Sequence, residues 1–193
     1  PFMREDLIAI KKRSTGSGKT EVHVLDHSKH YWGFKLQKAT PLGETGNEFD
    51  FISGDYNKDG YLDLIAVKKS STGSGKTEIH ILDGKSNYQD WILQEPTPLG
   101  PTGSNFDFVT GDYNRDGYVD IIAIKKSSTG SGKTEVHVLD GKSKYHDYNH
   151  QVATPLGETS NNYVFVPGDY NRDGFVDIIA IKKSSTGSGK TEV

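Results

Sequence analysis

The feature that most constrains the fold of this chain is an internal repeat with a constant period. The stretch D-Y-N-R-D-G-Y-V-D begins at Asp112, and its close copies begin at Asp55 and Asp169, at equal distances on either side. A broken copy ends at Asp6, one further period before Asp63. Repeat units of this size cannot bury their own apolar faces, so they pack against their neighbours as propeller blades or solenoid units do. The chain is therefore expected to be an array of similar units.

Each period contains four segments with the residue pattern of β-strands. Apolar and polar residues alternate in the first and third segments, whereas the second is apolar on both faces, as expected for a central strand. The fourth varies most between copies, which favours an edge strand. In one period the predicted strands are Phe106 to Thr110, Val119 to Ile124, Thr134 to Leu139 and about Tyr145 to Val152, followed by a turn-rich connection at 153–157. Frequent Gly and Pro leave almost no support for helices.

Four short antiparallel strands per repeat predict an all-β fold, a β-propeller built from 57-residue four-stranded antiparallel blades. The predicted organisation is a propeller repeat array with a partial blade at 1–48, blades at 49–105 and 106–162, and a partial blade at 163–193. About 3.4 repeats fit into the 193 residues, and a ring needs more. We therefore expect the ring to be closed by another chain, most simply in a homodimer of partial propellers, or by missing repeats.

The repeated loop has the oxygen pattern of a hard-cation site. Positions 1, 3, 5 and 9 carry Asp or Asn, position 7 can offer its carbonyl, and Gly at position 6 allows a sharp turn. Calcium is the predicted ion, and no EF-hand is expected because position 12 is Ala123 rather than Glu. The predicted metal ligands are Asp55, Asn57, Asp59, Tyr61 and Asp63; Asp112, Asn114, Asp116, Tyr118 and Asp120; and Asp169, Asn171, Asp173, Phe175 and Asp177.

Composition excludes several classes of function. Lys and Arg together number 23 against 26 Asp and Glu, so the chain is too balanced for nucleic acid to be its main partner. There is no cysteine and hence no disulfide framework. No apolar run approaches the roughly 18 residues of a membrane span. Lys pairs such as Lys125 and Lys126 are interpreted as solvated strand ends.

The loop and the apolar strand after it resemble the calcium-binding propeller repeats known as VCBS or FG-GAP repeats. The similarity rests on segments such as D-Y-N-K-D-G-Y-L-D-L-I-A-V at Asp55, and it recurs once in every period. The segment I-K-K-S-S-T-G-S-G-K-T-E-V-H-V-L-D-G also resembles repeats of fungal propeller lectins. Neither Phe-Gly nor Gly-Ala-Pro precedes the loop here. The resemblance implies calcium sites and an extracellular or secreted protein.

Two motifs could be mistaken for catalytic sites. Gly132-Lys133-Thr134 ends like a phosphate-binding loop, but Gly is missing five positions earlier and a strand follows instead of a helix. Glu135 and His137 share a strand face, as do their counterparts in other repeats. Catalytic sites are normally singular, so hairpin loops and solvated strand residues, or a ligand contact repeated in each blade, are the favoured interpretations. No enzyme activity is predicted.

Aromatic residues near the fourth strand are candidates for sugar binding, because the C–H groups of a sugar pack on aromatic rings while polar side chains bind its hydroxyls. Blade packing is the alternative explanation of the same residues. The candidate glycan ligands are Tyr88, Asp90, Trp91, Tyr145, Asp147 and Tyr148.

The leading functional prediction is a non-enzymatic, calcium-loaded lectin with repeated weak sites for glycans or glycoproteins, in which multivalency raises the avidity. The alternatives are a protein-interaction propeller in which calcium is only structural, and a non-catalytic module of a secreted protein.

Overall fold

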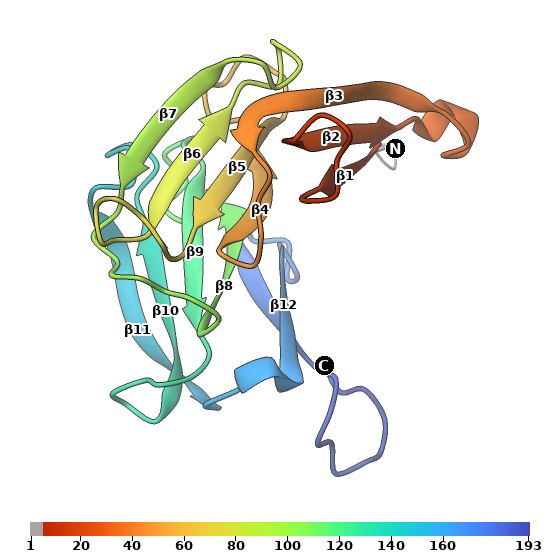
Figure 1. Cartoon of the computed structure of the whole chain (residues 1–193). Coiled ribbons are helices and arrows are strands. Elements are labelled where there is room, and N and C mark those ends of the chain that lie inside the picture. The colour runs from red at the N-terminus through yellow and green to blue at the C-terminus, as the bar shows by residue number, and fades with distance from the viewer. Residues whose placement is uncertain (1–5) are drawn as a thin grey trace.

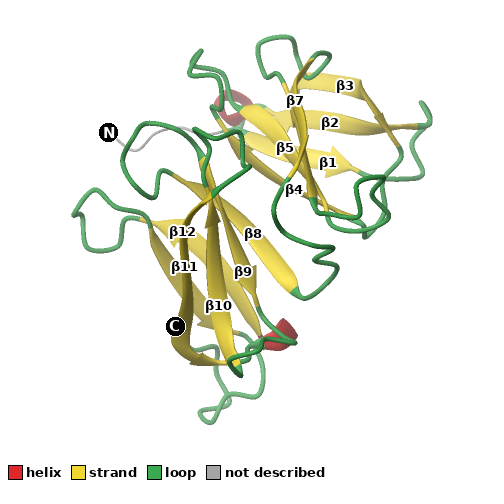
Figure 2. Cartoon of the chain, turned by 90° about the vertical axis from the view of Figure 1, so that its left-hand side faces the viewer, coloured by secondary structure: helices red, strands yellow, loops and turns green. Residues whose placement is uncertain are grey.

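The computed structural model describes residues 6–193 and contains thirteen β-strands in four antiparallel sheets (Figure 1). The only helical elements in this part of the chain are two short 3-10 turns, His27–Lys29 and Ser160–Asn162, drawn red in Figure 2. The strands are β1 (Leu7–Lys11), β2 (Lys19–Leu25), β3 (Phe34–Gly43), β4 (Phe49–Gly54), β5 (Asp63–Lys68), β6 (Glu78–Leu82), β7 (Trp91–Pro96), β8 (Phe106–Gly111), β9 (Asp120–Lys125), β10 (Lys133–Leu139), β11 (Tyr148–Gly157), β12 (Tyr163–Gly168) and β13 (Asp177–Lys182).

Two of the sheets are complete four-stranded meanders. Their strand orders are β4-β5-β6-β7 and β11-β10-β9-β8, so consecutive strands always pair. A three-stranded sheet, β1-β2-β3, precedes them, and a two-stranded sheet, β12-β13, follows. The first strands of the last three sheets begin at Phe49, Phe106 and Tyr163, which are equivalent positions of the repeat. The all-β class and the four-stranded antiparallel sheets predicted from the repeat are confirmed.

Three of the four strands predicted for each period lie where the pattern placed them, to within one residue or so at their ends. The fourth was misplaced, because β11 begins at Tyr148 rather than Tyr145 and runs to Gly157. Tyr145 has a φ of 65° and its N–H donates to the Asp140 carbonyl, so the chain is still turning there. Residues 153–157, predicted as a turn-rich connection, instead belong to β11: Ala153 pairs with Glu135 and Gly157 with Lys133, on the two sides of a register shift. Pro is tolerated in this segment because β11 is an edge strand.

Apolar side chains on both faces of the central strands hold neighbouring sheets together. Ile65 and Val67 of β5 pack with Phe108 and Ile121 of the next sheet, while Leu64 faces β1–β3 through Val22. Alternation of side chains along a strand produces this two-sided burial. Each complete sheet is therefore covered on both faces, like a blade between two others.

The innermost strands lie side by side. β4 contacts β8, and β8 contacts β12. The Thr110 hydroxyl donates to the Ser53 carbonyl at 2.8 Å, joining β8 to β4. At the end of β4, a Cβ on Gly54 would lie 2.8 Å from a methyl of Val119, so glycine provides the space for this side chain.

The sheets follow one another around an open arc, with β4, β8 and β12 on its inner side (Figure 1). No strand pairing joins β12-β13 to β1-β2-β3 within residues 6–193. No helix in that range has the length and apolar character needed to cross a membrane.

Candidate functional site

The loop between β4 and β5 folds around the carboxylate of its first residue. Asp55 Oδ1 accepts a hydrogen bond from the N–H of Asp59 at 3.0 Å, and Oδ2 accepts one from Gly60 at 3.0 Å. Asn57 Oδ1 accepts from the same Asp59 N–H at 3.1 Å. Lys58 and Gly60 have φ values of 62° and 85°, which produce the sharp turn expected at the glycine.

The other two loops repeat this arrangement. Asp112 accepts from the N–H groups of Asp116 and Gly117, and Asp169 accepts from those of Asp173 and Gly174. The three loops are therefore one local structure determined by one sequence pattern, in agreement with the predicted equivalence of the copies.

The ninth loop residue has a structural role of its own. Asp63 is fully buried; its Oδ2 accepts from Tyr56 N–H at 2.9 Å and its Oδ1 from Gly84 N–H at 2.8 Å. It thereby ties the loop to the turn that follows β6. Burial raises the pKa of this carboxyl, although both backbone hydrogen bonds act in the opposite direction. Asp120 bonds to Tyr113 and Gly141 in the same way, and Asp6 accepts from His27 N–H in the first sheet.

The donor set of the loops suits calcium, which prefers carboxylate, carboxamide and carbonyl oxygens. None of the nine loop carboxylates forms an ion pair with Lys, Arg or His in the described part of the chain, as a cation site would require. No three acidic, His or Cys side chains within residues 6–193 meet closely enough to hold an ion by themselves. An ion would therefore depend on Asn57 and the Tyr61 carbonyl as much as on Asp55, Asp59 and Asp63, and likewise in the other loops.

Two of the aromatic residues predicted to bind sugar belong to the core. Tyr88 is 6% exposed and its hydroxyl donates to the Leu62 carbonyl at 3.2 Å. Tyr145 is fully buried and donates to the Val119 carbonyl at 3.0 Å. Neither ring offers a face to a ligand, so their assignment as sugar platforms is corrected. The sequence could not reveal this, because the residues that cover the rings come from the facing sheet.

The remaining members of that predicted site lie nearer the surface. Trp91 and Tyr148 are half-buried, and each ring packs near a histidine, at 6.0 Å from His80 and 6.2 Å from His137. Asp90 and Asp147 are exposed. Their backbone carbonyls accept hydrogen bonds from Asp83 and Asp140, which close the turns before β7 and β11. An exposed carboxylate next to a half-buried ring is what remains of the predicted site.

The recurring Glu and His pairs of the third strand are held in hydrogen-bonded networks. His80 Nε2 lies 3.3 Å from Glu78 Oε2, and Ser74 Oγ donates to Glu78 Oε1 at 2.7 Å. Burial lowers the pKa of His80, although Glu78 acts in the opposite direction. The equivalent pairs are Glu21 with His23 and Glu135 with His137, joined at 3.3 Å and 3.5 Å. Each histidine also faces a glutamine of the next strand, Gln37, Gln94 or Gln151.

The segment that resembles a phosphate loop is the hairpin between β9 and β10. A strand follows Lys133 instead of a helix, so no helix N-terminus is present to receive a phosphate. Equivalent hairpins join β1 to β2 and β5 to β6. The hairpin interpretation is confirmed.

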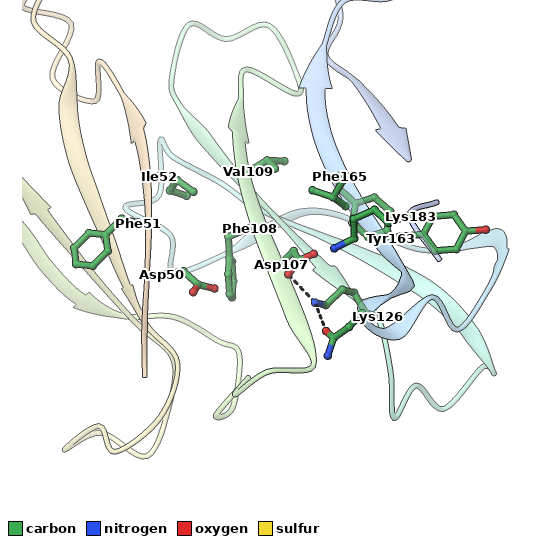
Figure 3. A pocket seen from close by; sticks show the side chains of 12 residues that line it. Asp50, Phe51, Ile52, Asp107, Phe108, Val109, Lys126, Tyr163, Phe165 and Lys183 are labelled. Atoms are coloured by element: carbon green, nitrogen blue, oxygen red, sulfur yellow. Dashed lines mark hydrogen bonds and ion pairs between the residues drawn. The ribbon is translucent and has the colours of Figure 1, made fainter. Parts of the chain in front are cut away.

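A groove of about 470 Å³ runs along the inner strands β4, β8 and β12 (Figure 3). Lys126 crosses it, 2.8 Å from Asp107 and 3.3 Å from Asn161, and is only 6% exposed. Lys69 and Asp50 form the equivalent pair at 3.0 Å. The interpretation of Lys126 as a solvated strand end was wrong, because the inner strand places a carboxylate beside it. In the sequence, Asp50 precedes Lys69 by the same number of residues as Asp107 precedes Lys126. This constant interval was the feature of the sequence that could have indicated the two ion pairs.

Comparison with protein families and curated proteins completes the description. Residues 55–123 match the FG-GAP-like repeat family, a span that begins with the first complete loop and ends within β9. No curated protein matches the chain significantly. The matched segment contains two of the three complete loops and the strands between them. Residues 55–123 thus carry repeats of the FG-GAP type.

Proposed function

We propose that this chain is a calcium-loaded, non-catalytic binding module that recognises glycans through repeated weak sites. The observation that carries the proposal is the threefold repetition of one hydrogen-bonded loop around Asp55, Asp112 and Asp169. Identical loops at fixed spacing supply the same surface several times, which suits multivalent attachment more than catalysis at a single centre.

Calcium would bind to the carboxylates, carboxamide and carbonyl of each loop. When bound, the ion would neutralise acidic groups that have no cationic partner within residues 6–193, and so stabilise the loop. For a secreted module we expect a calcium dissociation constant of about 10⁻⁴ to 10⁻³ M, the range typical of extracellular modules.

The absence of catalysis is part of the proposal. The Glu and His pairs that could have acted as acid and base recur in three sheets, and each has serine and glutamine neighbours. A structural role accounts for all three pairs at once.

A glycan array of the full chain tests the proposal. Binding should require calcium and should be competed by a simple sugar. Trp91→Ala, at a half-buried ring beside Asp90, should weaken binding while leaving the calcium content unchanged if the predicted strand-four site takes part. Absence of binding to any glycan at saturating calcium would contradict the glycan assignment.

A second candidate is a propeller-like protein-interaction module, in which calcium only stiffens the loops. The match of residues 55–123 to FG-GAP-like repeats favours it. Capture of a protein ligand that simple sugars do not displace would support this alternative over the lectin.

Closure of the ring with a second copy or with further repeats also stays a proposal. Light scattering tests the homodimer, since a stable monomer of 21.3 kDa would contradict it.

A further inference from the structure

The first and last sheets of the chain are complementary parts of one sheet. By their place in the repeat, β1, β2 and β3 are equivalent to β5, β6 and β7, and β12 and β13 are equivalent to β4 and β5. Within residues 6–193 the first sheet therefore has no inner strand, and the last has no third or fourth strand. The two sheets stand at opposite ends of the arc (Figure 1). Together, β12, β13, β2 and β3 would have the strand order of a complete sheet.

The contacts between successive loops stop at two residues that match each other. In two places the cation at the fourth position of one loop lies over the ring at the seventh position of the next: Lys58 over Tyr118 and Arg115 over Phe175. Arg172 has the fourth position in the last loop, and no ring of residues 6–193 lies beneath it. Tyr61 has the seventh position in the β4–β5 loop and is 52% exposed. Continuing the row places Arg172 of one copy over Tyr61 of a second copy.

Close packing beside the inner strands stops at a second matching pair. In two places a valine lies against the glycine that ends the inner strand of the preceding sheet: Val119 against Gly54 and Val176 against Gly111. Leu62 is the equivalent of these valines, yet it is 46% exposed. Gly168 ends β12 as the other glycines end their strands, and a Cβ there would meet nothing within 4 Å. Leu62 of one copy therefore fits beside Gly168 of a second copy.

A third matching pair lies at the outer edge of the sheets. Here the turn before a fourth strand contacts the fourth strand of the preceding sheet: Gln89 donates to the Ala39 carbonyl at 3.0 Å, and His146 lies 3.5 Å from Glu95. Trp32 is the equivalent of Gln89 and is 95% exposed. Val152 is the equivalent of Glu95 and is 45% exposed. An apolar pair thus replaces the polar contacts if the sheet of Val152 precedes the sheet of Trp32.

All three pairs require the same register between two chains. We infer that β2 and β3 of one copy add to β12 and β13 of a second copy, and that the exchange is reciprocal. Each exchange makes one hybrid four-stranded sheet, so two copies close a ring of six sheets. Propellers have about four to eight blades, whereas one chain closing on itself would have three. The inference rests on the proposed closure by a second copy and identifies its contacts.

Only one of the equivalent strands β1 and β13 fits into a hybrid sheet. β13 begins with Asp177, whose Oδ2 accepts from the Tyr170 N–H at 2.9 Å, so keeping β13 leaves its own loop whole. β1 is poorly covered, because Leu7 is 56% exposed whereas its equivalent Leu64 is 3% exposed. β1 is therefore the strand that is released, and β2 pairs with β13 of the second copy.

Cross-linking of the full chain tests the register. The sequence contains no cysteine, so the only thiols are those introduced. The variant with both Trp32→Cys and Val152→Cys should form a covalent dimer with a short bismaleimide. The control combines Trp32→Cys with Glu95→Cys, which moves the second thiol to the equivalent position one sheet earlier. The control should form no covalent dimer above the background of unsubstituted chain.

A glycine substitution tests the same interface without cysteines. Gly168→Trp should fill the space that Leu62 of the second copy takes, and raise the dissociation constant of the dimer at least tenfold. A large side chain is needed because a leucine, branched at Cγ, can turn away from a single methyl. Gly130→Trp is the control: Gly130 is equally open, has no left-handed φ and lies in the β9–β10 hairpin. Sedimentation measures association, and circular dichroism shows that both variants keep their sheets.

The possible outcomes separate the register from closure itself. A dimer that cross-links through positions 32 and 152 and is weakened by Gly168→Trp supports the exchange. A stable dimer without this cross-link would keep closure by a second copy but overturn the register. A ladder of larger covalent species would overturn the reciprocal exchange. A monomer of 21.3 kDa at every concentration would overturn both.

Discussion

The ammonium of Lys58 lies over the ring of Tyr118, 3.4 Å from its centroid, and joins the repeated Asp- and Asn-rich loops of two neighbouring sheets. Lys58 is the fourth residue of its loop and Tyr118 the seventh residue of the next. Arg115 lies over Phe175 in the same way, 5.0 Å from the ring centroid. The residue that turns one loop with a positive φ thus also contacts the following loop, so the loops form a connected row.

Removing the contact between Lys58 and Tyr118 should cost stability. A double-mutant cycle with Lys58→Met and Tyr118→Leu is expected to give a coupling of about 0.5–1 kcal/mol, the usual strength of an exposed cation–π pair. The Tyr118 carbonyl, a candidate calcium ligand, remains in both variants. Denaturant unfolding measures the cycle. Arg172→Met is the matched control, because no ring lies over Arg172 among residues 6–193. Strictly additive effects would contradict the coupling.

Each complete loop should bind one calcium. Metal analysis of the full chain should approach three ions, and Asp116→Ala should remove one, because Asp116 belongs to the donor set of a single loop. A chelator should lower the melting temperature, since an ion that binds only the folded chain stabilises it. Asp90→Ala, at an exposed carboxylate outside the loops, should leave the ion count unchanged. A calcium-free protein at millimolar calcium would refute the assignment.

Glycine at the end of β4 should be required for packing against the next sheet. Gly54→Ala is expected to destabilise by about 1–3 kcal/mol, because its Cβ would lie 2.8 Å from Val119. Adding Val119→Ala should recover part of the loss. Gly168→Ala is the internal control: it occupies the equivalent position in β12, and its Cβ would meet nothing within 4 Å. Thermal unfolding that showed equal losses for Gly54 and Gly168 would argue against this packing.

Acid should destabilise the sheets through their half-buried histidines. Burial lowers the pKa of His80 and His137, although the neighbouring glutamates act in the opposite direction. Below about pH 6.5 the unfolded chain therefore takes up protons that the folded chain does not. The free energy of unfolding should fall as the pH drops from 6.5 toward the lowered pKa values that these histidines have in the folded chain.

The pH dependence is measured by unfolding between pH 7.5 and 5 at constant free calcium. The variant with both His80→Gln and His137→Gln should lose less stability over this range than the unsubstituted chain. His30→Gln, at an exposed position, controls for the loss of a histidine. An unchanged slope in the double variant would exclude this origin of the acid sensitivity.

Local structure followed from the sequence, because each of its determinants lies within a few residues. The loop around Asp55 depends on carboxylates that bond N–H groups four and five residues later and on a glycine free to adopt a positive φ. The alternation of Val136 and Val138 with Glu135 and His137 likewise placed β10 correctly. The constant period of the repeat then determined that the sheets are equivalent.

Only the tertiary structure decided which side chains are buried and which groups they contact. Tyr145 carries the same local signals as a surface aromatic, yet it is buried, and Tyr56 from the β4–β5 loop of the neighbouring sheet packs against it with 5.9 Å between the ring centroids. The local sequence predicts a solvated strand end at Lys126, but β8 brings Asp107 to 2.8 Å. The reason is physical: burial depends on which distant segments pack together, and a repeat specifies its own conformation more directly than its contacts with the next copy.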